Sequence, residues 1–561
     1  MSQVIPGPAS SSPVVSPPRE RNGVVYTKRW VVDLMLDLAG YTPDRDLHRL
    51  VVVEPSAGDG SFVIAIVERL IASCERTGRN IEEATSSLAA YELDPRSARD
   101  CQTAVVALLE KNGTSAHFSA MLAQQWIKVG DYLLDRDDVP QADIVVGNPP
   151  YIRLEDVASE KAVQYRRRYG TMVGRADLYV AFFEAALNQL KPDGVSTFIC
   201  ADRWMLNQYG AQLRRMITSR FAVDAVIELH KADAFHSEVS AYPAITVIRA
   251  GTQREAVVAR AGATVSVLGS QGIRSVLNKA SDSAGVAVSH GGVKATRVSK
   301  WFTDAEPWPC YNPERLALLK RLEAEFYPLD STGTGTRSGI GIASGADRIY
   351  LTKDPNLIEP DRLLPIALAK DISSGHLEWS GNFLINPWER NGLVSLDKYP
   401  FMQRYLAAHE DELRGRHVGK KNPRGWYRTI DRVEAGLLGK TKLYIADIKD
   451  RLNPVLDRGE TYPHHNLYFV QSVGWDHEVL GGLLLSDVAQ FFIECYGVRM
   501  RGGYLRFQAQ YLRRIRVPRP QDISIDQANV LRRAFRERDV QLATEVALGL
   551  YEIDHLPQDD Y

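Results

Sequence analysis

The sequence has few cysteines and no long apolar run. Its five cysteines are far apart in 561 residues and form no CxxC pair, which argues against a structural zinc site and for reduced thiols in an intracellular protein. No window approaches the roughly 18 apolar residues that a membrane span needs, and the amino terminus lacks the basic start and apolar core of a signal peptide. These absences predict a cytoplasmic protein.

Net charge is also nearly absent, at −1, so overall electrostatics do not indicate a nucleic-acid binder. Two segments of the carboxy-terminal half differ. Residues 414–432 carry seven Lys or Arg against one acid, and residues 499–519 carry seven Arg and no acid, both with aromatic residues between them. This mixture suits phosphate contact with base stacking, although a solvated surface is the alternative. The candidate DNA-binding residues are Lys420, Lys421, Arg424, Trp426, Arg501, Tyr504 and Arg506.

The common phosphate-binding signatures are missing as well. A predicted strand at 50–53 is followed by Glu54-Pro55-Ser56-Ala57-Gly58-Asp59-Gly60-Ser61-Phe62, which fits neither GxGxxG nor the P-loop. Gly58 and Gly60 still permit a tight strand-to-helix turn and a close approach of a ligand to the backbone. The segment therefore indicates a ligand without phosphates, or else a structural glycine turn.

Strands and helices alternate from about residue 24 to 250. Apolar strands are predicted at 50–53, 88–91, 143–146, 195–200, 223–228 and 244–248, with helices at 31–39, 62–76, 177–190 and 209–220 between them. Such alternation predicts an α/β fold with a mostly parallel, doubly wound sheet. We further expect a disordered tail at 1–22, a connecting region at 251–330 with some short strands, an α+β domain at 331–520, and a closing helix at 526–550 followed by an acidic tail.

The strand at 143–146 ends in Asn148-Pro149-Pro150-Tyr151. Two prolines cannot continue a sheet ladder, so an amide, a backbone carbonyl and an aromatic ring gather at the carboxyl edge, where open α/β sheets bind ligands. The amide oxygen of Asn148 and the carbonyl of Pro149 can accept hydrogen bonds from one planar NH2 group, and Tyr151 can stack on that group. A proline-rich turn after a buried strand is the alternative interpretation.

Two acidic positions lie near the ends of neighbouring strands. Glu92 ends the second strand, where a carboxylate can accept both hydroxyls of a ribose, although surface acids are common at such places. Asp131 and Tyr132 place a carboxylate and a ring near the third strand's end, where they can bind and flank an adenine.

Taken in this order, the four segments resemble the cofactor half of class I S-adenosylmethionine-dependent methyltransferases, and Asn148–Tyr151 resembles the amino-methylating DNA methyltransferases. The chain is most similar to the N6-adenine group of the TaqI and Eco57I type. Further matches are Tyr26-Thr27, residues 177–184 with Phe182, Phe235 before residues 241–248, and the recognition-domain segments 341–348 and 502–508. Lys28 stands where proline is commoner, which leaves the exact carboxylate contact of Thr27 in doubt.

This resemblance implies a Rossmann-like methyltransferase domain at 23–250 and a target-recognition domain at 331–520. It implies S-adenosylmethionine as cofactor and adenine N6 of a flipped-out base in double-stranded DNA as target, without a metal. The chain would be a monomer on DNA and the modification component of a bacterial or archaeal restriction-modification system, with a separate endonuclease, or a solitary methylase. The implied cofactor-binding residues are Thr27, Glu54, Ala57, Gly58, Glu92, Asp131, Tyr132, Asn148 and Phe182; Asn148, Pro149 and Tyr151 are catalytic, and Tyr151 and Phe235 hold the base.

Three alternatives remain at this point. N4-cytosine methylation uses the same tetrapeptide, and the motif order together with the recognition-domain match favours adenine. Protein-glutamine methyltransferases also contain Asn-Pro-Pro-Tyr, but they are much shorter and lack the basic, aromatic carboxy-terminal half. A non-catalytic DNA-binding specificity module would not need the cofactor motifs. Phe235 could equally be a buried hairpin phenylalanine.

Overall fold

The computed structural model divides the chain into two compact units, Met1–Pro313 and Glu314–Tyr561. It describes residues 25–135, 139–237, 242–283, 287–299, 301–309, 313–497 and 504–557. The tail predicted at 1–22 lies outside these described residues. Each unit has its own hydrophobic core.

A ten-stranded sheet forms the centre of the first unit, in the order β3-β2-β1-β4-β5-β7-β6-β8-β10-β9. Strands β3 to β5 in this order are parallel, and β7 is antiparallel to its neighbours β5 and β6. The predicted doubly wound α/β fold is confirmed. The strands are β1 Val52–Glu54, β2 Leu88–Glu92, β3 Ile127–Val129, β4 Ala142–Gly147, β5 Leu190–Ala201, β6 Phe221–Glu228, β7 Pro243–Ala250, β8 Ala256–Ala261, β9 Val288–His290 and β10 Val293–Val298.

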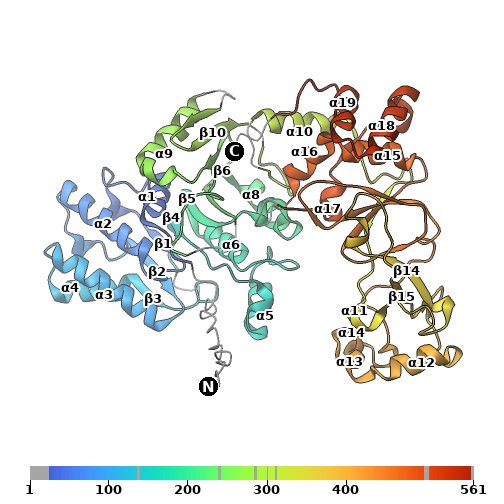
Figure 1. Cartoon of the computed structure of the whole chain (residues 1–561). Helices are drawn as coiled ribbons and strands as arrows, with labels where there is room; N and C mark the ends of the chain where they lie inside the picture. Colours follow the sequence, from blue (N-terminus) through green and yellow to red (C-terminus); the bar gives the residue numbers. More distant parts are fainter. Residues whose placement is uncertain are drawn as a thin grey trace, which may run out of the picture. The chain divides into compact units, whose positions relative to one another are not determined.

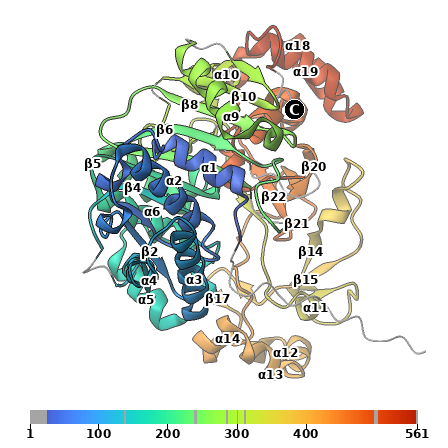
Figure 2. The ribbon, with the colours of Figure 1, turned by 90° about the vertical axis from the view of Figure 1, so that its left-hand side faces the viewer.

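Helices cover both faces of this sheet, and Figure 1 shows α2, α3 and α4 on one side with α6 and α8 on the other. Figure 2 looks toward α1, α2 and α3. Local sequence explains where α3 begins, because Asp94 accepts a hydrogen bond from the Ser97 N–H and Pro95 occupies the first turn. The helices are α1 Arg29–Leu38, α2 Ser61–Thr77, α3 Pro95–Lys111, α4 Ala116–Trp126, α5 Ser159–Arg168, α6 Tyr179–Gln189, α7 Arg203–Leu206, α8 Ala211–Arg220 and α9 Val265–Asp282.

Two parts of this unit differ from the sequence-based expectations. The third strand was expected to end near Asp131 but was given no bounds, because the three residues of β3, with a single buried side chain, form too short a pattern to locate. The expected connecting region contributes β8, β9 and β10 to the central sheet, together with α9, which packs on α1. Strand β8 pairs with β6, and β10 pairs with β8 and β9. The weak hydrophobic periodicity of this region did not indicate these pairings.

The second unit contains two four-stranded sheets, β12-β22-β18-β20 and β13-β15-β14-β21, and three short two-stranded ribbons. Figure 1 shows α12, α13 and α14 at one end of this unit and α18 and α19 at the other. The helices are α10 Pro313–Glu325, α11 Asp347–Tyr350, α12 Pro400–Ala407, α13 Glu410–Gly415, α14 His417–Lys421, α15 His477–Leu485, α16 Asp487–Tyr496, α17 Ala509–Leu512, α18 Ile525–Glu537 and α19 Val540–Leu550.

The strands of the second unit are short. They are β11 Tyr327–Pro328, β12 Arg337–Ile340, β13 Leu351–Thr352, β14 Leu363–Ala367, β15 Phe383–Ile385, β16 Trp388–Glu389, β17 Gly392–Leu393, β18 Lys442–Ala446, β19 Ile448–Lys449, β20 Val455–Asp457, β21 Tyr462–Pro463, β22 Leu467–Gln471, β23 Leu505–Arg506 and β24 Arg516–Val517. No single helix in the described residues is long and apolar enough to cross a membrane; α15 and α16 pass that test only as a pair, which is bent by 63°.

The single closing helix predicted at 526–550 is wrong, because the structure has two helices there. Helix α18 ends at Glu537, its C-cap Arg538 adopts a left-handed conformation with φ of 59°, and Asp539 then caps α19 by accepting from the Leu542 N–H. A capping aspartate within an otherwise periodic stretch is a helix-start signal.

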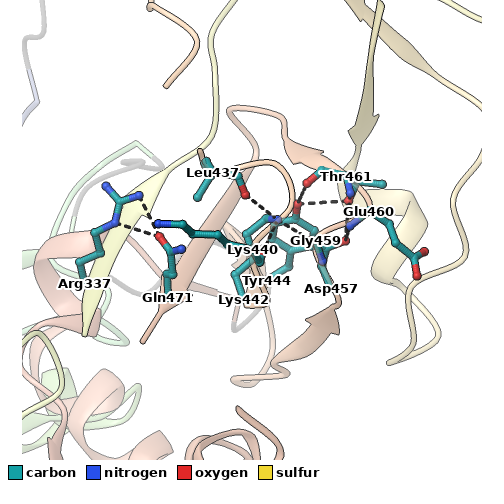
Figure 3. A network of polar contacts seen from close by, with 10 residues as sticks. All are labelled: Arg337, Leu437, Lys440, Lys442, Tyr444, Asp457, Gly459, Glu460, Thr461 and Gln471. Carbon is teal, nitrogen blue, oxygen red and sulfur yellow. Dashed lines mark hydrogen bonds and ion pairs between the residues drawn. The ribbon is translucent and has the colours of Figure 1, made fainter. Parts of the chain in front are cut away.

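A buried ion pair ties together one sheet of the second unit (Figure 3). Lys442 on β18 and Asp457 on β20 are both fully buried, and their side chains pair directly. The Lys442 ammonium also donates to the carbonyls of Leu437 and Lys440, at 3.1 Å each. Asp457 in turn accepts from the backbone N–H groups of Gly459, Glu460 and Thr461. Burial lowers the pKa of Lys442, and the Asp457 partner opposes that shift.

We predict that Lys442→Met destabilises the protein by about 3–5 kcal/mol, because Asp457 is left buried without its counter-charge. Arg519→Met is the matched control, since Arg519 pairs with Asp522 on the surface and such pairs contribute little. Urea unfolding followed by tryptophan fluorescence measures both variants. Equal stability losses in the two variants would contradict the structural role of the buried pair.

Candidate functional site

A cavity of about 450 Å³ opens at the carboxyl ends of β1, β2 and β4. Its lining comes from segments far apart in the sequence: residues 25–27, 55–59, 61–62, 92–95, 130–133 and 148–152, with Tyr165, Leu178 and Phe182. Except for Glu54 and Phe235, every residue predicted to bind the cofactor or the target base lies in this lining. Parallel strands explain the convergence, because their carboxyl ends meet at one edge.

Glu54 ends β1 directly behind this lining. Its side chain is fully buried, and one carboxylate oxygen accepts the Ser56 N–H at 2.9 Å, while the other has no partner among the described residues. Burial raises the pKa of Glu54 to about 8, the Ser56 N–H lowers it, and the nearby Glu92 raises it again. A Cβ at Gly147 on the adjacent β4 would lie too close to Glu54 Oε1, so a side chain there would displace the Glu54 carboxylate.

Glu92 bridges the turns that follow β1 and β2. Its two carboxylate oxygens accept the N–H groups of Gly58 and Asp94, at 2.8 Å each. Gly58 has φ of 54° in this turn, a conformation that favours glycine. Each carboxylate oxygen retains a second lone pair, so Glu92 is held rigidly and can still accept hydrogen bonds from a ligand.

Tyr132 and Phe182 form an apolar wall of the cavity. Their rings stack with centroids 5.7 Å apart and an interplanar angle of 21°. Both side chains are buried, and the Tyr132 hydroxyl donates to Gln189 Oε1 at 2.5 Å. This wall stands next to Asp131, so a carboxylate and two flat rings lie where an adenine was expected.

Neighbouring groups define the orientation of the Asn148 side-chain amide. Its Nδ2 donates to the Val25 carbonyl at 2.8 Å and to Thr27 Oγ1 at 3.1 Å. Because a backbone carbonyl can only accept, the NH2 group must face Val25, and Oδ1 must point away from it. That oxygen is buried and has no donor in the described part of the chain. Ser56 Oγ donates to the Asn148 carbonyl at 3.1 Å and fixes the backbone.

Tyr151 and Phe235 meet at a right angle. Their ring centroids are 6.4 Å apart with an interplanar angle of 84°. Phe235 reaches this place because it pairs with Thr27 in an antiparallel bridge, and the His236 N–H donates to the Tyr26 carbonyl at 3.0 Å. The structure thus brings together Thr27, Asn148, Tyr151 and Phe235.

Sequence reasoning missed several side chains of this site. Ser56 was visible in the glycine-rich segment but carried no assigned role. Tyr165 and Lys161 on α5 both contact Asp131, at 2.7 and 3.1 Å. They lie in a charged helix without any motif, so only the packing of α5 reveals them.

The predicted DNA-binding residues of the second unit have mixed environments. Lys420, Lys421 and Arg424 are exposed, and Tyr504 is 49% exposed. Arg506 pairs with Asp447 at 2.5 Å. Trp426 is buried in the core with the Arg414 guanidinium over its ring, so that ring is not available for base stacking in this structure. Arg501 lies outside the described residues.

Two groups of histidine and acidic side chains have ligand atoms within 4.8 Å of one another, namely Asp347–His464–His465 and Asp202–Glu228–His230. Both are already engaged in ion pairs, with His464–Asp347 at 3.0 Å and His230–Asp202 at 2.7 Å. Neither group belongs to the described lining of the cavity.

Comparison with known proteins agrees with this geometry. The family model "Eco57I restriction-modification methylase" matches residues 96–235. The type II methyltransferase M.PaeR7I of Pseudomonas aeruginosa is 42% identical, covering 96% of this chain and 92% of the relative. M.XhoI of Xanthomonas vasicola is 38% identical, covering 97% and 99%. The fold also resembles the type IIL restriction-modification enzyme MmeI solved with DNA, with a TM-score of 0.58, 11% identity and coverage of 93% and 72%.

The fold and the cavity define a methyltransferase of the class I architecture. The sequence identity to relatives matched over more than 90% of their length defines the family more narrowly than the fold does. The chain belongs to the type II methyltransferases of restriction-modification systems. The predicted resemblance to this family is confirmed. Methyltransferases of this class use S-adenosylmethionine as methyl donor.

The pH dependence of stability tests the environment of Glu54. Its pKa is about 8 in the folded protein against a usual 4.5, so the folded state holds more protons than the unfolded state between these values, and stability falls as pH rises through that range. Glu54→Gln removes this term. We therefore predict that the free energy of unfolding of the variant, minus that of wild type, is larger at pH 9 than at pH 4 by at least about 1 kcal/mol. Unfolding at both pH values measures the gain, and a constant difference would contradict a raised pKa.

Proposed function

We propose that this chain transfers a methyl group from S-adenosylmethionine to the N6 amino group of adenine in double-stranded DNA, with the target base turned out of the duplex. The observation that carries the proposal is the orientation of Asn148, whose Oδ1 has no donor while its NH2 group is held by Val25 and Thr27. A side chain fixed in this way can accept a hydrogen bond from an N–H group of a ligand. The family membership supports DNA as the substrate.

The amino group of adenine is a poor nucleophile, because its lone pair is delocalised into the ring. Asn148 Oδ1 and the Pro149 carbonyl would each accept one N–H of this group, which favours a pyramidal nitrogen with a localised lone pair. Because the amide and the proline backbone are held rigidly, the nitrogen is positioned before reaction, and such positioning accounts for much of an enzyme's acceleration.

The cavity residues fit S-adenosylmethionine, which supplies an electrophilic methyl group on a sulfonium and leaves as a neutral thioether. Glu92 would accept the ribose hydroxyls, and Asp131 would accept the adenine amino group beside the Tyr132–Phe182 wall. The Thr27 hydroxyl accepts from Asn148 and keeps its own proton to donate toward a carboxylate. Glu54, with its unpartnered oxygen behind the turn at Ala57 and Gly58, suits a cationic neighbour.

The right angle between Tyr151 and Phe235 suits a flipped base. One ring can stack on the face of the base while the other contacts it with its edge. Turning a base out of the duplex costs roughly a few kcal/mol, and base–aromatic stacking of about 1–3 kcal/mol per contact offsets much of this cost.

The second unit is proposed to recognise the DNA sequence. Its exposed Lys420, Lys421, Arg424 and Tyr504 would contact phosphates and bases, and Arg501 and Arg506 remain predictions for the same role. We further propose that the protein acts as a monomer on DNA and that a separately encoded endonuclease accompanies it.

We predict that Asn148→Ala lowers the methylation rate by at least about 100-fold, because the transition state loses a preorganised polar partner. The Kd for S-adenosylhomocysteine should change far less than the rate, because the lost Oδ1 acceptor serves the target amino group even though Asn148 is also an implied cofactor-binding residue. Asn188→Ala, an exposed asparagine at the end of α6 that bonds Arg220, is the matched control. Near-normal turnover in Asn148→Ala would refute the assigned role.

We predict that Tyr151→Ala weakens capture of the flipped base. The measurement is the fluorescence of 2-aminopurine at the target position, which rises when the base leaves the stack. At saturating enzyme, the variant should show a smaller rise in 2-aminopurine fluorescence than wild type. An equal rise would refute the stacking role of Tyr151.

The chemical identity of the product tests the proposed function directly. The purified chain is incubated with tritiated S-adenosylmethionine and DNA, RNA or protein, and labelled DNA is digested to nucleosides. We expect N6-methyladenine in DNA. Detection of N4-methylcytosine would mean that the target base is cytosine and not adenine. Label found only in protein would overturn the proposal. Long-read sequencing of DNA from a methylation-free host expressing the chain then gives the recognition site.

A further inference from the structure

Residues 152–178 leave the sheet after β4 and return to α6 as a closed excursion that contains α5. Its two ends are joined by the Leu178 N–H donating to the Ile152 carbonyl at 2.8 Å and by an antiparallel bridge between Arg153 and Asp177. Figures 1 and 2 both show α5 at the lower edge of the first unit. The excursion begins immediately after Tyr151, so one segment leads from the target-base side of the site to the cofactor side.

Tyr165 on α5 lines the cavity and is only 4% exposed. Its hydroxyl donates to Asp131 Oδ2 at 2.7 Å, and Lys161 one turn earlier donates to the same oxygen at 3.1 Å. Burial and the Asp131 charge raise the pKa of Tyr165, so this hydroxyl keeps its proton and remains a donor near neutral pH.

Among the described residues, three donors reach the Asp131 carboxylate, and one of its acceptor sites has no donor. Its Oδ1 accepts the Leu133 N–H at 3.1 Å, so three donors serve two oxygens that together offer about four lone-pair sites. Because Oδ2 receives two of the donors, the remaining site belongs to Oδ1. The Asp131 N–H donates to Asp135 Oδ2 at 2.7 Å and holds the backbone as well.

We propose that Tyr165, assisted by Lys161, is a positioning residue that turns the free acceptor site of Asp131 toward the 6-amino group of the cofactor's adenine. This inference rests on the proposed function, in which Asp131 binds that adenine. Tyr165 acts through Asp131 and is not itself catalytic. Its specific consequence is discrimination: a rigid acceptor favours an amino group and disfavours a carbonyl oxygen in the same position.

The test compares two ligands that differ at position 6 and at the neighbouring N1, which accepts a hydrogen bond in adenine and carries a proton in hypoxanthine. S-adenosylhomocysteine carries the 6-amino group, and S-inosylhomocysteine carries an oxygen instead. Calorimetry gives the Kd of each for wild type, Tyr165→Phe and Lys161→Met. We expect Tyr165→Phe to bind S-adenosylhomocysteine about tenfold more weakly and to narrow the ratio of the two Kd values at least about threefold.

Tyr169→Phe is the matched control, because the Tyr169 hydroxyl is also buried near this loop but donates to the Leu133 carbonyl at 2.6 Å. It should leave the ratio unchanged. Lys161 is 41% exposed, so Lys161→Met keeps the inference testable if Tyr165→Phe fails to fold. In both test variants KM for the cofactor should rise, while kcat at saturating cofactor changes less than about twofold.

Two outcomes would overturn the inference. Equal weakening of both ligands would mean that Tyr165 only packs, and tighter S-adenosylhomocysteine binding by Tyr165→Phe would mean that Tyr165 competes with adenine for Asp131. The result is separable from the proposed function. If Tyr165→Phe narrows the ratio of the two Kd values but the chain does not methylate adenine in DNA, the inference stands and the proposed function is refuted. If the ratio is unchanged and the chain methylates adenine in DNA, the inference is refuted and the proposed function stands.

Discussion

The carboxyl ends of β1 and β4 lie side by side at the centre of the sheet, and the site depends on this adjacency. It places the Glu54 carboxylate against Gly147, where a side chain would displace that carboxylate, and it sets Ser56 within hydrogen-bonding distance of the Asn148 backbone. In the proposed function, the first strand carries the cofactor side and the fourth carries the acceptor side. Because both strands are central and parallel, the two halves of the site are held by the same hydrogen-bonded ladder.

The site uses backbone carbonyls and buried carboxylates to orient its side chains. Val25 turns the Asn148 amide, the glycine-rich turn holds Glu92, and α5 holds Asp131. Each of these side chains is fixed by hydrogen bonds and keeps at least one acceptor site without a donor among the described residues. Orienting the groups before the substrates arrive avoids a reorganisation cost during reaction. Glu54 shows the cost of such an arrangement, since a buried carboxylate with an unpartnered oxygen disfavours its charged form in the folded protein.

The second unit is held together differently. The Lys442–Asp457 pair is completely buried, and its other hydrogen bonds go to residues just before β18 and just after β20. Arg416 likewise donates to the carbonyls of Ser344, Trp426 and Arg428, so part of the basic segment at 414–432 serves packing. The basic residues of that segment with exposed side chains are Arg414, Lys420, Lys421, Arg424 and Arg432.

The sequence by itself determined the strand–helix alternation, the doubly wound sheet and the residues at the strand ends, because these depend on local periodicity and on residues such as Pro149 and Gly58 that restrict or release the backbone. It also indicated the family. Only the tertiary structure decided which way the Asn148 amide points, that Phe235 meets Tyr151 at a right angle, that Trp426 is buried, and that Tyr165 reaches Asp131. These features depend on contacts between residues distant in the chain, and a local pattern carries no information about such contacts.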